Sequence, residues 1–324
     1  LDTAVLLGIV PKRYQELNLS ALDTYFAMAR GYQGESGDVK ALAMKKWFNT
    51  NYHYIVPEAE DDTKIALVGE KLWEEYEEAK ALGIETKPVL TGPYTLLKLC
   101  RYTGSKTADD FTDAVIAAYQ QVLEKCAAHR IMWLQLDEPA LVRDLSKEDI
   151  ALFHKIYENI LPCKKTVEIL LQTYFGDVRD IYKDLTELPF DGIGLDFIEG
   201  KETVHLIEKY GFPKDKLLFA GLVNGKNIWR NHYDRTLNQL QQLTGKGIQT
   251  VLSTSCSLLH VPYTVKHETK LSEKYLDYFA FAEEKLSELK ELSGFAENPS
   301  YTQESAYKKN SALFAADRDC KNAA

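Results

Sequence analysis

Seven short segments of the chain share one pattern, in which an apolar, β-forming run ends in polar or turn-forming residues and a helical stretch follows. Continuous apolar runs are typical of strands buried on both faces, as in a parallel sheet covered by helices. Polar residues at strand ends are typical of a (β/α)8 barrel, whose functional residues lie at that face. We therefore expect an α/β fold, a (β/α)8 TIM-type barrel lacking its first strand. The seven segments are residues 52–58, 88–93, 132–139, 167–177, 192–198, 217–225 and 250–256.

Length and composition indicate a globular protein with one large core. The 324 residues suit one barrel of roughly 250 residues with extra segments. The formal charge of −9 argues against a nucleic-acid partner, and no apolar run is long enough to span a membrane. The start lacks the pattern of a signal peptide, so we expect a cytoplasmic protein.

The cysteines favour reduced thiols over a disulfide framework. They are odd in number and form no CxxC pair. The five are Cys100, Cys126, Cys163, Cys256 and Cys320.

Helical patterns separate the strands. Thr107 with Asp110, and Ser146 with Asp149, predict two N-terminal capping boxes. After residue 294 the periodicity fails, so we assign residues 1–295 to the barrel and 296–324 to a tail or inter-barrel linker, partly helical near 305–316. The expected helices cover residues 1–31, 69–82, 107–128, 146–161, 178–185, 201–210, 234–245 and 272–292.

Residues 44–58 form the densest cluster of candidate binding side chains. Lys45 and Lys46 precede three aromatic residues and two amides, Asn49 and Asn51. Amides hydrogen-bond planar rings and lysines attract carboxylates, so this composition suits an anionic, partly aromatic ligand. A barrel entrance with aromatic packing and solvated lysines fits the same residues equally well.

The sequence of residues 44–58 closely resembles the N-terminal barrel of cobalamin-independent methionine synthases, as do residues 135–141, 173–177, 221–230 and 253–262. The resemblance implies a methyltransferase that moves the methyl group of 5-methyltetrahydropteroyltriglutamate to homocysteine. In that family a C-terminal barrel holds zinc and homocysteine, and the N-terminal barrel helps to bind the polyglutamate tail of the folate. The resemblance assigns a tail contact to Lys46, and we add Asn49, Asn51 and Arg230 as candidate substrate-binding residues.

Two features of the family have no counterpart in this sequence. One is an opening strand with a Gly-Phe-Pro-Arg-Ile-Gly motif, and the other is the whole catalytic barrel. We therefore expect an N-terminal piece that is inactive alone, with no catalytic residue and no metal ligand of its own. Zinc and homocysteine would then belong to the absent C-terminal barrel.

Other candidates have weaker support. Asp137 and Glu138 follow a strand, where carboxylates can act as acid and base, but adjacent strand residues face opposite ways and we favour structural hydrogen bonds. The sequence around Cys256 and His260 contains no His-x-Cys pair of the kind that binds zinc. We therefore expect Cys256 to be a buried, inert thiol. Residues 227–230 suit either an interface or a loop held by tryptophan packing.

The alternatives to the methyltransferase are a stand-alone noncatalytic TIM-barrel binding module and a free-standing barrel enzyme using the carboxylates near Asp137.

Overall fold

The structure, a computed structural model, describes residues 1–315 and has an α/β fold. The chain divides into two compact units. Unit 1 comprises Leu1–Thr173 and Val178–Ile193, and unit 2 comprises Tyr174–Asp177 and the chain from Gly194 onward. Residues 316–324, including Cys320 and the end of the predicted tail, lie outside the described residues.

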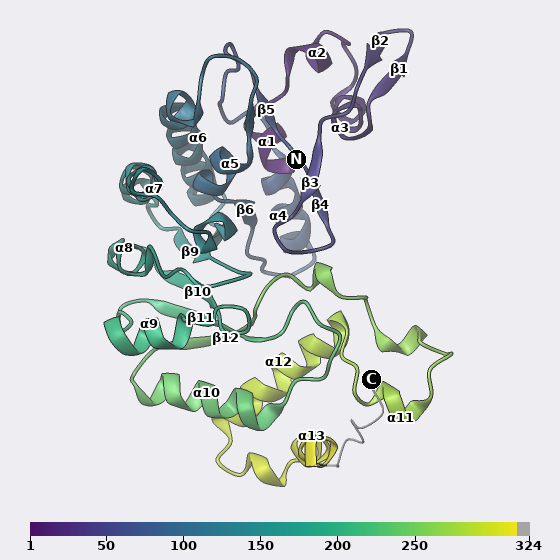
Figure 1. The fold of residues 1–324 in the computed structure, drawn as a ribbon, viewed down its shortest axis with the longest axis vertical. Helices are drawn as coiled ribbons and strands as arrows, with labels where there is room; N and C mark the ends of the chain where they lie inside the picture. Colours follow the sequence, from purple (N-terminus) through teal and green to yellow (C-terminus); the bar gives the residue numbers. More distant parts are fainter. Residues whose placement is uncertain (316–324) are drawn as a thin grey trace. The chain divides into compact units, whose positions relative to one another are not determined.

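Six strands form a parallel sheet in the order β12-β11-β10-β9-β8-β6 (Figure 1). They correspond to six of the seven predicted segments. In unit 1, β8 pairs in parallel with β9, and Leu134 lies opposite Ile169, both fully buried. In unit 2, β11 pairs in parallel with β12. The strands are β6 Val89–Thr91, β8 Trp133–Asp137, β9 Glu168–Gln172, β10 Gly192–Asp196, β11 Leu217–Val223 and β12 Thr250–Thr254.

The remaining predicted strand, residues 52–58, does not join this sheet. The expectation of seven parallel strands was therefore wrong for the described chain. Instead, β4 (His53–Ile55) pairs antiparallel with β3 (Met44–Lys46). In β4, His53 is exposed and Tyr54 and Ile55 are half-buried, whereas a central strand of a parallel sheet is buried on both faces. Farther along, β5 (Glu58–Ala59) pairs in parallel with β7 (Arg101–Tyr102) in a separate two-stranded sheet.

The predicted N-terminal helix is three short helices instead of one. Gly8, with φ of 70°, and Pro11 interrupt the helical pattern, and Ser20 starts the third helix by accepting a hydrogen bond from the Asp23 backbone. The link that follows residue 31 is a hairpin of β1 (Tyr32–Gly34) and β2 (Gly37–Val39). The three helices are α1 Asp2–Leu6, α2 Lys12–Gln15 and α3 Ala21–Arg30.

In unit 1, the helices predicted at 69–82, 107–128 and 146–161 are confirmed as α4, α6 and α7, whereas α5 was not predicted and the helix expected at 178–185 begins at Tyr182. Both capping boxes are present, at Thr107 with Asp110 and at Ser146 with Asp149, which confirms the starts of α6 and α7. Figure 1 shows these helices beside the strands of the same unit. The helices are α4 Lys71–Ala81, α5 Pro93–Leu99, α6 Ala108–Ala128, the 3-10 helix η1 Pro139–Val142, α7 Lys147–Ile160, η2 Leu161–Cys163 and α8 Tyr182–Glu187.

In unit 2, the last described helix packs on α10. The Asn310 side chain accepts from the Tyr233 backbone at 3.1 Å and donates to the Asn231 carbonyl at 2.8 Å, and Phe314 stacks on His232. The expected helix near 305–316 is thus present as α13. The elements are α9 Thr203–Tyr210, α10 Tyr233–Gly245, η3 Leu258–His260, η4 Val265–His267, α11 Glu273–Leu276, α12 Ala282–Glu297, η5 Tyr301–Gln303 and α13 Ser305–Ala315.

Candidate functional site

The β3–β4 hairpin carries three of the four predicted binding residues. Lys46 ends β3 opposite His53, and Asn49 and Asn51 lie in the loop that connects the two strands. All three predicted side chains are exposed. The structure therefore brings Lys46, Asn49 and Asn51 together in one accessible segment.

Hydrogen bonds within the hairpin loop fix its shape. The Trp47 backbone N–H donates to the Tyr52 carbonyl at 2.8 Å, which closes the loop. The buried Thr50 donates from its hydroxyl to the Trp47 carbonyl at 2.7 Å and accepts from the Tyr52 N–H at 3.2 Å. Phe48 adopts a positive φ of 51°, a backbone conformation uncommon outside glycine. The loop that carries Asn49 and Asn51 is thus ordered by its own contacts.

The two faces of the hairpin differ in chemistry. Cross-strand partners lie on the same face, and successive residues alternate between faces. Lys45 opposes Tyr54, and the Trp47 ring meets Tyr54 edge to face at 5.6 Å, which defines an aromatic face. Lys46 and His53 lie on the opposite face. The two adjacent lysines therefore present their charges on different sides of the hairpin.

Neither Lys45 nor Lys46 pairs with a carboxylate among residues 1–315. Both side chains are exposed, so their charges remain available to an anion in solvent. Such attraction weakens with added salt, because exposed charges are screened over about 10 Å at 0.1 M ionic strength.

Arg230, the fourth predicted residue, lies in unit 2 and is engaged by its own surroundings. Its backbone N–H donates to the Tyr278 carbonyl at 2.8 Å, and its Nε donates to the Asp277 carbonyl at 3.3 Å. The same Nε lies 3.8 Å from the fully buried carboxylate of Glu288. Next to it, Trp229 is 54% exposed and stacks on Phe279 at 5.1 Å. The role of Arg230 in substrate binding stays a prediction.

Glu138 has a structural hydrogen-bonding role. Its side chain is fully buried and accepts from the backbone N–H groups of Tyr94 and Thr95 at 3.0 and 2.7 Å. These are the first N–H groups of α5, which otherwise lack partners. The Tyr157 hydroxyl donates to the same carboxylate at 2.5 Å. Burial raises the pKa of Glu138 to about 7.

Gly92 explains how this carboxylate reaches the helix. A Cβ atom at Gly92 would lie 2.2 Å from Cδ of Glu138, a separation that real atoms do not adopt. Asp137, the neighbour of Glu138, accepts from the Gln135 amide at 2.7 Å and is half-buried. The two carboxylates therefore do not form an acid and base pair facing a common cavity.

Unit 2 has a polar cluster where its strands end, which sequence reasoning missed. Asp196, at the end of β10, accepts from the backbone N–H groups of Phe175, Ile198 and Glu199. Glu199 pairs with Lys226 at 2.7 Å, and the Lys226 ammonium lies 5.0 Å from the centre of the Phe175 ring. The signal that identifies Asp196 is a carboxylate directly after an apolar run.

The described residues offer no metal site. Within residues 1–315, no group of three or more His, Cys, Asp or Glu side chains is arranged to hold a metal ion. Cys256 is buried, and burial raises the pKa of its thiol to about 12, so it is not a thiolate at neutral pH. The His260 ring contacts Phe175 at 5.5 Å, and its pKa is lowered by burial and then by Lys226.

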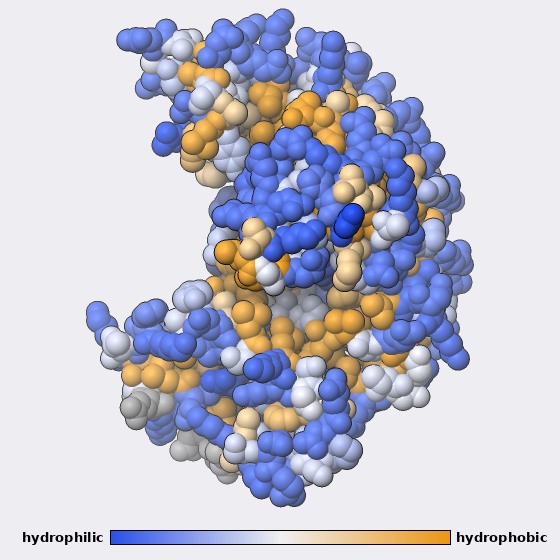
Figure 2. Space-filling view, turned by 180° about the vertical axis from the view of Figure 1, so that it is seen from behind, coloured by the Kyte–Doolittle hydropathy of each residue, from blue (hydrophilic) through white to orange (hydrophobic). Residues whose placement is uncertain are grey.

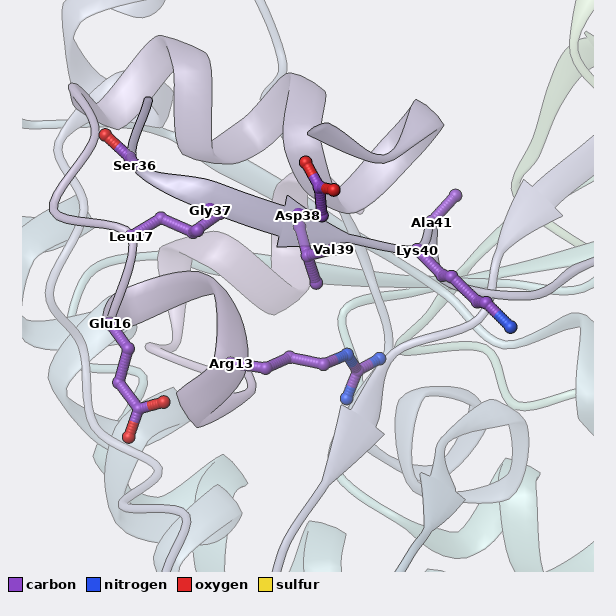
Figure 3. A pocket seen from close by; sticks show the side chains of 9 residues that line it. All are labelled: Arg13, Glu16, Leu17, Ser36, Gly37, Asp38, Val39, Lys40 and Ala41. Carbon is purple, nitrogen blue, oxygen red and sulfur yellow. The ribbon is translucent and has the colours of Figure 1, made fainter. Parts of the chain in front are cut away.

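A polar pocket of about 620 Å³ lies beside the β1–β2 hairpin (Figure 3). Glu16 and Asp38 line it together with Arg13 and Lys40, so it carries both signs of charge. The Arg13 guanidinium is already paired with the buried Glu58 at 2.6 Å. This contact ties α2 to β5 and gives Arg13 a structural role.

None of the helices in residues 1–315 combines the length and apolar composition that a membrane crossing requires. Hydrophilic residues, in blue, are spread over much of the face shown in Figure 2.

Comparison with known proteins gives a consistent result. Residues 1–247 match the family model of the cobalamin-independent synthase, N-terminal domain. The 5-methyltetrahydropteroyltriglutamate–homocysteine methyltransferase of Campylobacter jejuni subsp. doylei is 55% identical over 318 residues, which are 97% of this chain and 41% of that protein. The protein of the same name from Streptococcus suis is 54% identical over 324 residues, which are 100% of this chain and 42% of that protein.

The chain thus spans about two-fifths of the length of these relatives. Among solved structures, a B12-independent methionine synthase from Shewanella sp. W3-18-1 aligns with a TM-score of 0.51 at 15% identity, covering 76% of this chain and 71% of that chain. This likeness concerns the fold.

Proposed function

Because the chain belongs to the family of the cobalamin-independent synthase N-terminal domain, we propose that it is the folate-tail-binding and structural part of a methionine-forming methyltransferase. The complete enzyme would transfer the methyl group of 5-methyltetrahydropteroyltriglutamate to homocysteine. The relatives that bear the name of this activity are longer proteins, and the chain spans 41–42% of their length.

The observation that carries the proposal is the exposed, ordered β3–β4 hairpin. Lys46 lies on it beside Asn49 and Asn51. A triglutamate tail carries several carboxylates, and lysine is a compact cation on a flexible stem that can follow them. Asn49 and Asn51 supply donors and acceptors for the amide groups of the tail.

We place the methyl-transfer chemistry, homocysteine and zinc in the part of the longer relatives that this chain does not span. The contribution of this part is to position the folate. Such positioning matters because a displacement of about 1 Å can lower a rate on the order of a hundredfold. We also propose that the six-stranded sheet belongs to a (β/α)8-type barrel, in a cytoplasmic protein; the helices that alternate with its strands support the barrel.

Binding measurements with ligands of different tail length test the proposal. Purified chain is titrated calorimetrically with the triglutamate and monoglutamate forms of 5-methyltetrahydrofolate, at two salt concentrations. We expect tighter binding of the triglutamate and a larger loss of its affinity at high salt. Equal affinities for the two forms, unaffected by salt, would overturn a tail-binding role.

A further inference from the structure

Arg143 lies against the hairpin from a distant part of the sequence. Its guanidinium carbon is 4.8 Å from the centre of the Phe48 ring, within the range of a cation–π contact. The Arg143 side chain is nevertheless exposed to solvent. A guanidinium that stacks by its flat face keeps the N–H donors at its edges free for other partners.

The segment that carries Arg143 is firmly mounted. Arg143 directly follows η1 as its C-cap, and its backbone N–H donates to the Ala140 carbonyl at 3.3 Å. The Ala140 N–H donates to the Thr95 hydroxyl at 3.2 Å, and η1 directly follows the buried Glu138. The base of the Arg143 side chain is thus fixed relative to α5.

Arg143 lies on the aromatic face of the hairpin. Phe48 meets the Trp47 ring edge to face at 5.0 Å, and Trp47 meets Tyr54 at 5.6 Å. Burial raises the pKa of Tyr54, and the charge of Arg143 partly opposes that rise. Lys45 lies opposite Tyr54, so Lys45 and Arg143 put two cations on the face away from Lys46.

We propose that Arg143 is a second carboxylate-binding residue of the hairpin site. A ligand with several carboxylates would contact Arg143 and Lys45 on the aromatic face and Lys46 on the opposite face, passing the loop that carries Asn49 and Asn51. The planar guanidinium can bind one carboxylate through two parallel hydrogen bonds. This inference rests on the proposed function, and adds a residue that makes binding depend on the number of carboxylates.

The aromatic side chains extend the argument to the ligand class. Trp47 and Phe48 are half-buried, so part of each ring is accessible beside the two cations. An aryl group joined to glutamates, as in the p-aminobenzoyl-glutamate part of a folate, presents a ring and carboxylates in one molecule. A plain acidic peptide offers only the carboxylates.

The test uses the whole chain and three probes, namely p-aminobenzoyl-triglutamate, p-aminobenzoyl-monoglutamate and triglutamate without the aryl group. Variants are Arg143→Ala, Arg143→Lys and Lys46→Ala, with Lys290→Ala as a control, because Lys290 is an exposed lysine on α12 in unit 2. We expect Arg143→Ala to weaken triglutamate binding roughly three- to tenfold, the scale of one ordinary hydrogen bond, and Arg143→Lys to weaken it less. The aryl-free probe should bind more weakly than the aryl-bearing one.

The outcomes separate this inference from the proposed function. If Lys46→Ala weakens triglutamate binding while Arg143→Ala leaves it unchanged, the role of Arg143 is overturned and the proposed function stands. If wild-type chain binds none of the probes, both fail. Equal binding of aryl-bearing and aryl-free triglutamate overturns the contribution of the aromatic face. Thermal unfolding of Arg143→Ala should stay close to wild type, because the exposed side chain loses only its contact with Phe48.

Discussion

Replacing Glu138 by glutamine should alter the pH dependence of stability. The carboxylate accepts three hydrogen bonds, from the Tyr94 and Thr95 N–H groups and the Tyr157 hydroxyl. Glutamine is similar in shape but presents an oxygen at one side only, so its NH₂ group must face a donor such as the Thr95 N–H. At pH 5 the buried wild-type carboxyl is protonated, but its hydroxyl oxygen can still accept a hydrogen bond, whereas the amide nitrogen of glutamine cannot. A buried donor left without an acceptor costs about 1–3 kcal/mol, so the variant should be less stable by that amount at pH 5.

The titration of Glu138 lowers the stability of the wild type as the pH rises. Burial raises its pKa from an ordinary value of 4.5 to about 7 in the folded protein. Between these values the folded state holds one proton more than the unfolded state, so stability falls as the pH rises. The loss is about 3 kcal/mol once the pH exceeds 7, from 1.36 kcal/mol per unit of pKa. Glutamine cannot titrate and loses nothing from this source.

Urea unfolding of both proteins at pH 5, 6, 7 and 8, followed by circular dichroism, measures the two effects. The free energy difference between wild type and Glu138→Gln should shrink steadily over this range and become small or reverse by pH 8. A difference that stays constant from pH 5 to pH 8 would show that the buried carboxyl does not titrate there, and would refute the reasoning.

Three further changes test the local structure. Gly92→Ala should destabilise the chain by about 1–3 kcal/mol in urea unfolding, since its Cβ would lie 2.2 Å from Cδ of Glu138, while Gly245→Ala, with open space at its Cβ position, should not. The pKa of His154 is raised, mainly by its 2.6 Å contact with Asp184. The resulting stabilisation is present below pH 6.5 and lost as the pH rises through the raised pKa. His154→Gln should abolish this small pH dependence of stability in thermal unfolding. Asn310→Ala should lower the stability of unit 2 by about 1–3 kcal/mol, because it leaves the buried Tyr233 N–H without its acceptor, and hydrogen exchange at that amide should speed up; unchanged exchange would contradict the docking of α13.

Much of the fold followed from local sequence signals. Capping boxes at Thr107 and Ser146 act within one turn of a helix, and apolar runs such as 192–196 identify buried strands. Both can therefore be predicted from the sequence. The β3–β4 hairpin was not predicted, because an apolar run does not reveal its pairing partner. Within the segment predicted as a buried strand, His53 is exposed and Tyr54 and Ile55 are half-buried.

The candidate site was predictable in part for the same reason. Lys46, Asn49 and Asn51 are close in sequence, and the hairpin keeps them close in space. Glu138 stood out as a carboxylate after a strand, but its partners on α5 depend on tertiary packing. The contact of Arg143 with Phe48 joins segments far apart in the chain, so no local sequence pattern predicts it.

The most direct test of tail binding by the hairpin is the effect of Lys46→Ala on the choice between long and short folate tails. In the full-length enzyme, we expect the variant to raise KM for the triglutamate substrate more than for the monoglutamate, with little change for homocysteine. An exposed charge contact is worth about 0.2–1 kcal/mol, so the ratio of the two KM values should shift up to about fivefold and the shift should shrink in high salt. A fall in kcat alone, with the preference between long and short tails unchanged, would contradict the account and assign Lys46 to the packing of the hairpin.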